Sequence, residues 1–206
     1  MKFSKRNLIY SLILGEASSW FLIFVIKNPY VAEFKKLVFL EDVVWWLPVI
    51  FPIIFLAGIL LAEILAKTIK IIYQIVRFAE VGVLNTFIDF GILNLLIWLT
   101  GITGGLAIAP LNAISFLVAC TNSYFWNKFW TFEKEGTVTR KEFTQFLVIS
   151  GIGIGINTGI VVAGTSLISP LLGFSPGAWA NLIKVLATAV SMIWNFLGYK
   201  FIVFKK

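Results

Sequence analysis

Six apolar stretches, each long enough to cross a bilayer, dominate the sequence. About 20 helical residues span the hydrocarbon core, and a helix satisfies its own backbone hydrogen bonds where water is absent. The stretches are Leu8–Ile26, Val43–Ala66, Phe78–Leu99, Ile108–Trp130, Phe143–Ile168 and Ala178–Ile202. The sequence therefore predicts an all-α polytopic membrane protein with about six transmembrane helices.

Composition excludes most soluble and catalytic classes. Charged residues make up 13% of the 206 residues, about half the share of a soluble domain. His is absent and Cys120 is the single cysteine. Imidazole-based catalysis, Cys/His zinc sites and disulfides are thereby excluded, and we expect no cofactor or metal. The net charge of +7 lies at the ends of the apolar stretches, which favours anionic lipids over nucleic acid as partners.

The distribution of Lys and Arg predicts the orientation. The three residues Lys27, Lys35 and Lys36 lie on one side, and Lys184 lies inside a span. The remaining thirteen lie on the other side: Lys2, Lys5, Arg6, Lys67, Lys70, Arg77, Lys128, Lys134, Arg140, Lys141, Lys200, Lys205 and Lys206. By the positive-inside rule, both termini should be cytoplasmic.

Residues 1–76 form an N-terminal extension with two predicted spans. The first span follows Lys2, Lys5 and Arg6 as in a signal peptide, but no small-x-small cleavage site follows it, so we expect it to be retained. The segment 67–77 (KTIKIIYQIVR) is amphipathic and predicts an interfacial helix on the inner leaflet.

The rest of the chain contains an internal repeat. Asn85-Thr86 and Asn157-Thr158 lie 72 residues apart, and the same shift aligns NKFWTF at 127–132 with YKFIVF at 199–204. The repeats span about 77–132 and 145–204, each with two spans, which predicts a pseudo-two-fold axis along the membrane normal. Such a duplication can place a substrate path at the repeat interface, or simply build a four-helix bundle.

Three motifs resemble the GtrA-like family: RFAEVGVLNTFIDFGI, NSYFWNKFWTF and NFLGYKFIVF. The resemblance covers roughly residues 77–206 and implies a four-helix transmembrane domain in the plasma membrane of a prokaryote. It also implies flipping of polyprenyl- or dolichyl-phosphate-linked sugars for cell-surface polysaccharide or glycan modification. The extension departs from the family pattern, and Ile202 stands where the family often has Trp.

Ionisable residues inside spans are functional candidates, because a charge in lipid costs several kcal/mol. Asp89 lies roughly 18 Å along its helix from Arg77, and Lys184 roughly 24 Å from Lys200. Their similar depth leaves two compatible interpretations, an Asp89–Lys184 ion pair or a polar lining for a headgroup. Glu80, three residues after Arg77, is expected to form a local ion pair with it.

Phosphate and sugar recognition suggest a further set of residues. Arg77, Lys128 and Lys200 lie at the predicted inner interface and can bind a lipid phosphate, with snorkelling as the alternative. The predicted headgroup pathway adds neutral amides to Asp89 and Lys184, and helix–helix hydrogen bonding is the alternative for these amides. They are Asn85, Asn122, Asn127, Asn157 and Asn195.

Three functions stay open on the sequence. The first is a lipid-linked sugar flippase that is not an enzyme. The second is a non-catalytic subunit that anchors a membrane glycosyltransferase to its lipid substrate. The third is a proton-coupled small-molecule exporter with Glu16 or Asp89 as the proton carrier. A second copy of the chain is a further candidate partner.

Overall fold

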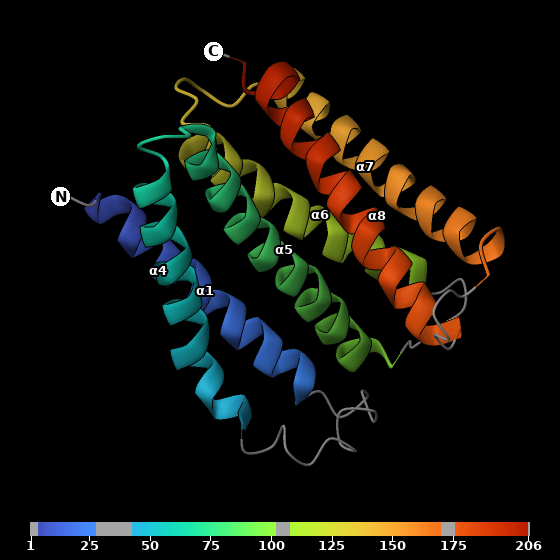
Figure 1. Ribbon diagram of the computed structural model, residues 1–206. Helices are drawn as coiled ribbons and strands as arrows, with labels where there is room; N and C mark the ends of the chain where they lie inside the picture. Colours follow the sequence, from blue (N-terminus) through green and yellow to red (C-terminus); the bar gives the residue numbers. More distant parts are fainter. Residues whose placement is uncertain (1–3, 28–42, 102–107, 170–175, 206) are drawn as a thin grey trace. The chain divides into compact units, whose positions relative to one another are not determined.

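The computed structural model describes residues 4–27, 43–101, 108–169 and 176–205, and every regular element in these ranges is helical (Figure 1). The α-helices are α1 (Lys5–Ile26), α4 (Leu47–Leu65), α5 (Ile71–Thr100), α6 (Ile108–Trp126), α7 (Arg140–Ser166) and α8 (Pro176–Gly198). A 3-10 turn, η1 (Val44–Trp46), precedes α4, and two π-helical turns, η2 (Asn127–Thr131) and η3 (Tyr199–Val203), follow α6 and α8. The predicted all-α architecture is confirmed, and each α-helix falls on one of the six apolar stretches.

Among the described residues, three segments are long and apolar enough to cross a membrane: Lys5–Ile26, Val44–Leu65 and Ile71–Thr100. The segment that contains α4 is the most apolar of these, with a mean hydropathy of 2.4. Its side chains Ile53, Ile54 and Leu61 are more than half exposed. A helix that is apolar on its outer face as well as its inner face is suited to lipid. The chain is therefore a multi-pass membrane protein.

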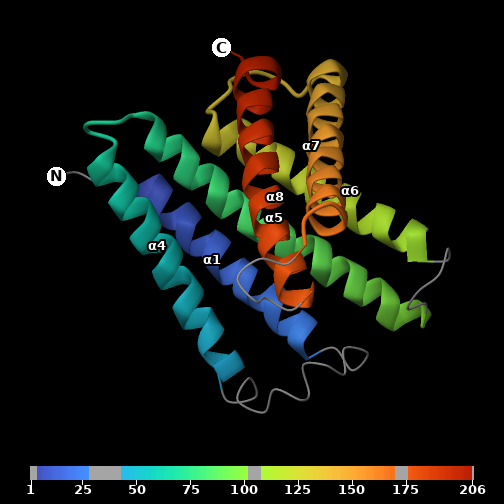
Figure 2. The same ribbon diagram turned by 45° about the vertical axis from the view of Figure 1, so that its right-hand side comes forward.

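The chain divides into two compact units, Met1–Glu133 and Lys134–Lys206. The first contains α1, η1, α4, α5, α6 and η2, and the second is a helical hairpin of α7 and α8 ending in η3 (Figure 2). The core of the first unit draws on α1, α4, α5, α6 and η2: Leu14, Phe55, Ile59, Val81, Leu84, Ile88, Ala119 and Trp130. The extension thus shares one core with the first predicted repeat.

Glycine determines how α1 and α4 approach each other. A Cβ on Gly15 would lie 2.7 Å from Cα of Pro52 and 2.8 Å from its nitrogen. Real side chains do not tolerate such a contact with backbone, so the two helix backbones touch because Gly15 has no side chain. Close backbone approach at small residues is the usual way in which transmembrane helices gain packing energy.

The segment 67–77 is not a separate interfacial helix, and this prediction is wrong. Residues 66–70 form a turn, and α5 then runs without interruption from Ile71 to Thr100. Part of the apolar face that suggested an interfacial helix packs on protein, since Tyr73 and Val76 lie against the core of the first unit, while Ile69 is 52% exposed. An amphipathic pattern alone does not distinguish a bilayer surface from a neighbouring helix.

Candidate functional site

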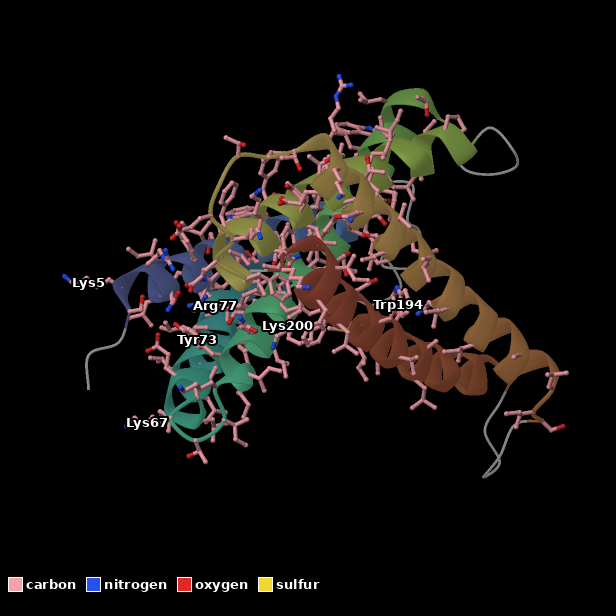
Figure 3. All side chains as sticks on the ribbon, turned by 90° about the horizontal axis from the view of Figure 1, so that it is seen from above. Lys5, Lys67, Tyr73, Arg77, Trp194 and Lys200 are labelled. Carbon is pink, nitrogen blue, oxygen red and sulfur yellow. The ribbon has the colours of Figure 1, made fainter. Side chains whose placement is uncertain are left out.

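Arg77 lies at the centre of a buried polar network at one end of the first unit. Its side chain is 4% exposed, and Nη1 donates to the carbonyl oxygen of Trp130 at 2.7 Å. Nη2 donates to Oδ1 of Asn7 at 3.0 Å. The guanidinium also stacks 4.0 Å from the ring centre of Tyr73 (Figure 3). Arg77 thereby connects α1, α5 and η2, which lie far apart in the sequence.

Two residues of the extension complete this network. Asn7 Oδ1 accepts a second bond from the indole nitrogen of Trp130 at 3.0 Å, and Asn7 Nδ2 donates to Glu63 at 3.2 Å. Glu63 also accepts from the Tyr73 hydroxyl at 2.8 Å. The N-terminal end of α1, the C-terminal end of α4 and the start of α5 are therefore joined by side-chain hydrogen bonds.

Glu133 links the same network to the surface. Its Oε1 forms ion pairs with Arg77 at 2.9 Å and with Arg6 at 2.6 Å. The residue directly follows the turn after η2, and its φ of 49° is in the left-handed region. A non-glycine residue loses about 1–2 kcal/mol in that conformation. The two ion pairs partly offset that cost.

Lys128 and Lys200 occupy matching positions in two π-helical turns. Each is the second residue of its turn, in η2 and in η3. The turns close in the same way, with Phe132 N bonded to Asn127 O at 2.9 Å and Phe204 N bonded to Tyr199 O at 2.7 Å. Single π turns are rare in proteins and occur frequently at functional sites.

The aromatic surroundings of the two lysines also match. The first ammonium lies 5.9 Å from the Tyr124 ring centre and 5.8 Å from that of Phe129. The second lies 5.6 Å from the ring centres of both Phe196 and Phe201. Both lysines thus sit between the ring four residues before and the ring one residue after, within cation–π range. They differ in burial, because Lys128 is fully buried while Lys200 is partly exposed.

Polar side chains inside the bilayer span of the first unit pair across α5 and α6. Asn122 Nδ2 donates to Asn85 Oδ1 at 2.9 Å, and the Ser115 hydroxyl donates to Asp89 Oδ1 at 2.7 Å. Asn85 and Asp89 are four residues apart and share one face of α5. The two pairs form a polar seam along this hairpin. Asn85 and Asn122 thus make the helix–helix hydrogen bond that was one of their two predicted roles.

The other predicted pathway residues have different surroundings. Asn127 Nδ2 donates to the Ser123 carbonyl at 2.9 Å, and its Oδ1 is buried without a partner among the described residues. Asn157 is partly buried on α7. In α8, the Asn195 amide packs so closely on Gly153 of α7 that a Cβ there would overlap it. The Lys184 side chain lies outside the described residues, so its ion pair with Asp89 stays a prediction.

The expected ion pair between Arg77 and Glu80 does not form. Within the described part of the chain, the carboxylate paired with Arg77 is that of Glu133. Glu80 instead accepts the hydroxyl of Ser11 on α1 at 2.7 Å. Residues three apart are neighbours on a helix surface, but they need not bond to each other when another element offers a partner. Here the neighbouring helix and η2 supply those partners.

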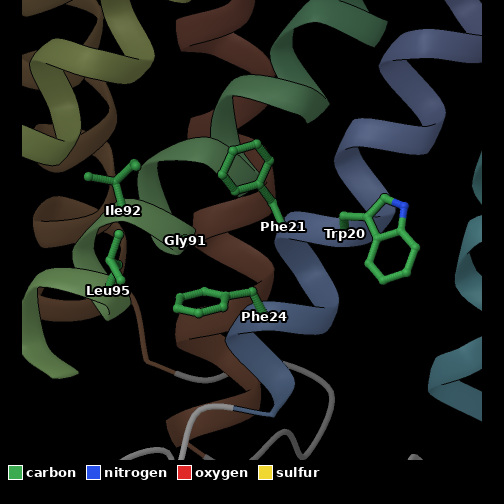
Figure 4. A pocket seen from close by; sticks show the side chains of 6 residues that line it. All are labelled: Trp20, Phe21, Phe24, Gly91, Ile92 and Leu95. Carbon is green, nitrogen blue, oxygen red and sulfur yellow. The ribbon is translucent and has the colours of Figure 1, made fainter.

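An apolar groove lies between α1 and α5 (Figure 4). It has a volume of about 280 Å³ and is lined by Trp20, Phe21, Phe24, Gly91, Ile92 and Leu95. The indole nitrogen of Trp20, the one polar side-chain group among these six residues, donates to Glu16 at 2.7 Å. This lining suits a hydrocarbon chain better than a phosphate or a sugar hydroxyl.

Comparison with known proteins gives the family. The family model described as the GtrA/DPMS transmembrane domain matches residues 77–204, which is more than half of the chain. The chain belongs to the GtrA/DPMS family. This domain begins at Arg77 and ends at Phe204, so it contains both π turns, and the extension precedes it.

A relative in Bacillus subtilis (strain 168) matches about as many residues of this chain as the family model does. It is the uncharacterized membrane protein YngA, 32% identical over 128 residues, which are 62% of this chain and 77% of the relative. No solved structure matches the chain.

Sequence reasoning missed several residues that form the polar contacts of the first unit. They are Asn7, Ser11, Tyr73, Ser115 and Glu133. A signal for two of them was present: Asn7 and Ser11 are four residues apart at the start of an apolar span and share one helix face. Polar residues spaced in this way favour contacts with another helix. Which helix they contact could not be read from the spacing.

Proposed function

We propose that the chain translocates polyprenyl- or dolichyl-phosphate-linked sugars across the membrane, as a flippase without enzymatic activity of its own. The observation that carries this proposal is the matched pair of lysines, each in a π turn and each between two aromatic rings. Family membership supports it independently. The pairing also favours the internal repeat, because turn, lysine and rings all recur at the same 72-residue shift.

The lysines would bind the phosphate of the lipid. An ammonium group supplies three donors and a full positive charge to a phosphate oxygen. Rings beside Lys128 and Lys200 fix the direction of each side chain and stabilise its charge. Both Nη atoms of Arg77 already donate to protein groups, so its direct contact with phosphate stays a prediction. Its observed bonds support a role in holding η2.

The polar seam in the first unit would line the path of the sugar. A hexose presents hydroxyls that exchange hydrogen bonds with amides and carboxylates, so it can replace the internal bonds of Asn85, Asn122 and Asp89 one by one. The hydrocarbon chain would remain in lipid, because the outer faces of the helices are apolar. Asn127, Asn157, Asn195 and Lys184 complete the proposed path.

We place the basic end of the first unit at the cytoplasmic face of a prokaryotic plasma membrane. Lys67, Lys70, Arg77 and Lys128 lie near the ends of helices that meet there, which agrees with the positive-inside rule. Figure 3 shows Lys67, Tyr73 and Arg77 at this end together with Lys5. Both termini would then be cytoplasmic, and anionic lipids would surround this end.

The test measures lipid binding and function with the same variants. Lys128→Gln and Lys200→Gln should each weaken binding of undecaprenyl- or dolichyl-phosphate-glucose to the purified protein by about ten- to one-hundred-fold, since one charge-assisted hydrogen bond contributes about 1.5–3 kcal/mol. The exposed Lys70→Gln is the control and should bind normally. Sugar modification of the cell envelope should fail in cells that carry the double variant. Full complementation by a normally expressed double variant would contradict the proposal.

Two other functions are outcomes of the same experiment. Co-purification with a membrane glycosyltransferase, combined with lipid binding but no translocation in vesicles, would select the anchoring subunit. Proton-driven uptake of a small molecule that is lost in Glu16→Gln or Asp89→Asn would select the exporter. Glu16 accepts the Trp20 indole and Asp89 accepts the Ser115 hydroxyl, so each already has a neutral donor.

A further inference from the structure

Glu80 is a buried carboxyl in the middle of the three-helix contact of α1, α4 and α5. Its side chain is 6% exposed. Oε2 lies 2.7 Å from the hydroxyl of Ser11 on α1. Oε1 is buried and has no hydrogen-bond partner among the described residues. On the α4 side it faces Gly58, where a Cβ would lie 3.7 Å from Oε1.

The surroundings of Glu80 do not suit a negative charge. A buried carboxylate needs a cation or several donors, and without them it avoids the cost by taking up a proton. The nearest basic side chain in the sequence, Arg77, forms its ion pair with Glu133. Arg77 Nε is itself buried without a partner in the described part of the chain. The cation and the carboxyl are thus neighbours on α5 that do not bond.

Other charged groups near this end face other partners. On α4, Glu63 accepts from Asn7 and Tyr73, and α6 carries no Asp, Glu, Lys or Arg between Ile108 and Trp126. Arg6 on α1 pairs with Glu133, and Lys128 in η2 lies between its two rings. Among the described residues, Arg77 is the charged group that acts electrostatically on Glu80.

We propose that Glu80, with Ser11, is a proton-binding site that couples translocation to the proton gradient. The resting state holds the proton on the carboxyl, which shares a hydrogen bond with Ser11. Loss of this proton to water leaves a carboxylate whose available partner is Arg77 Nε. Movement of Arg77 toward Glu80 weakens its bond to the Trp130 carbonyl, and Trp130 belongs to the same π turn as Lys128. Proton release would thereby change the position of a phosphate-binding lysine.

The coupling rests on the proposed function, but the proton site does not. Infrared difference spectroscopy of the purified protein detects the carbonyl stretch of a protonated carboxylic acid. At neutral pH, wild type should show such a band that is absent from Glu80→Gln and should lose it when the pH is raised. Glu135→Gln is the matched control and should leave the band unchanged, because its side chain is exposed and lies outside this contact. Equal spectra for wild type and Glu80→Gln would overturn the proposal.

A second variant covers the case in which Glu80→Gln does not fold. Ser11→Ala removes the hydroxyl partner and keeps the acid, so it should shift the frequency of the same band without abolishing it. A folded Ser11→Ala protein with an unshifted band would overturn the assignment to Glu80.

Coupling is measured in vesicles with an imposed pH gradient. If one proton moves with each lipid, the accumulation ratio should change by up to about tenfold for each pH unit, and Glu80→Gln should not respond. If wild type translocates the lipid equally with and without the pH gradient, the coupling is overturned and the proposed function remains intact. Absence of translocation in wild type would count against the proposed function, and the infrared band would still decide the proton site.

Discussion

Replacing Arg77 by Met is expected to be among the most destabilising substitutions at the basic end. Met keeps much of the length of the side chain and removes its donors. Two buried bonds are lost, to the Trp130 carbonyl at 2.7 Å and to Asn7 at 3.0 Å. Hydrogen bonds of charged groups contribute about 1.5–3 kcal/mol each. The Glu133 ion pair adds little, since its carboxylate is 44% exposed.

The expected loss is about 3–5 kcal/mol of unfolding free energy, from two charged hydrogen bonds. It lies below the simple sum of the upper values because Asn7 keeps its bond from the Trp130 indole. Equilibrium unfolding in mixed micelles with a denaturing detergent measures this quantity. Lys70→Met is the control on the exposed surface of the same end, and its effect should stay within about 0.5 kcal/mol.

A double-mutant cycle isolates the contact that joins the extension to the family domain. Asn7→Ala and Arg77→Met should show a coupling free energy of about 1–3 kcal/mol, because they share one buried hydrogen bond. Two results would refute the reasoning: a loss below about 1 kcal/mol for Arg77→Met, or strict additivity with Asn7→Ala. Arg77 would then be a surface anchor, as the snorkelling alternative predicts.

Three further predictions concern packing and topology. Gly15→Ala should lower the unfolding free energy by about 1–3 kcal/mol, because the added methyl meets the backbone of α4. Gly82→Ala should raise it by about 0.5–1 kcal/mol, since nothing described lies within 4 Å of its Cβ. Detergent unfolding of both variants measures the difference, and equal effects would refute the close approach of α1 and α4. Gly153→Ala should cost about 0.5–1.5 kcal/mol in the same assay, because the facing amide must leave its preferred rotamer, and an unchanged unfolding curve would argue against that contact. Single cysteines placed in 169–177 should react with an impermeant reagent from outside the cell and those in 133–141 should not, and the reverse pattern would invert the proposed orientation.

Hydropathy and spacing by themselves determine the helices and the family of this protein. The six helices follow from runs of about 20 apolar residues, because in lipid the backbone can satisfy its hydrogen bonds within a single helix. The family motifs between Arg77 and Phe204 can likewise be recognised in the sequence, and the matching family model confirms the predicted family. Both are local properties of the chain.

Tertiary structure decided which partner each polar residue takes. Arg77 and Glu80 are three residues apart, yet Arg77 bonds to Asn7 and Trp130 while Glu80 bonds to Ser11. These partners come from other elements, and a periodic pattern does not state which helix a face will meet. The same reason explains the segment 67–77, in which Tyr73 and Val76 pack against the core of the first unit.

The two π turns show most clearly what the sequence does not predict. The 72-residue repeat aligns Lys128 with Lys200, but the sequences of the turns, NKFWT and YKFIV, contain no helix breaker that would predict an i→i+5 bond. The turns form where α6 and α8 end, in register with aromatic residues one turn earlier. Sequence alone thus determined where the lysines recur, and packing at the helix ends decided how each lysine is held. A backbone widens to a π turn only when the surrounding side chains compensate for its weaker hydrogen-bond geometry.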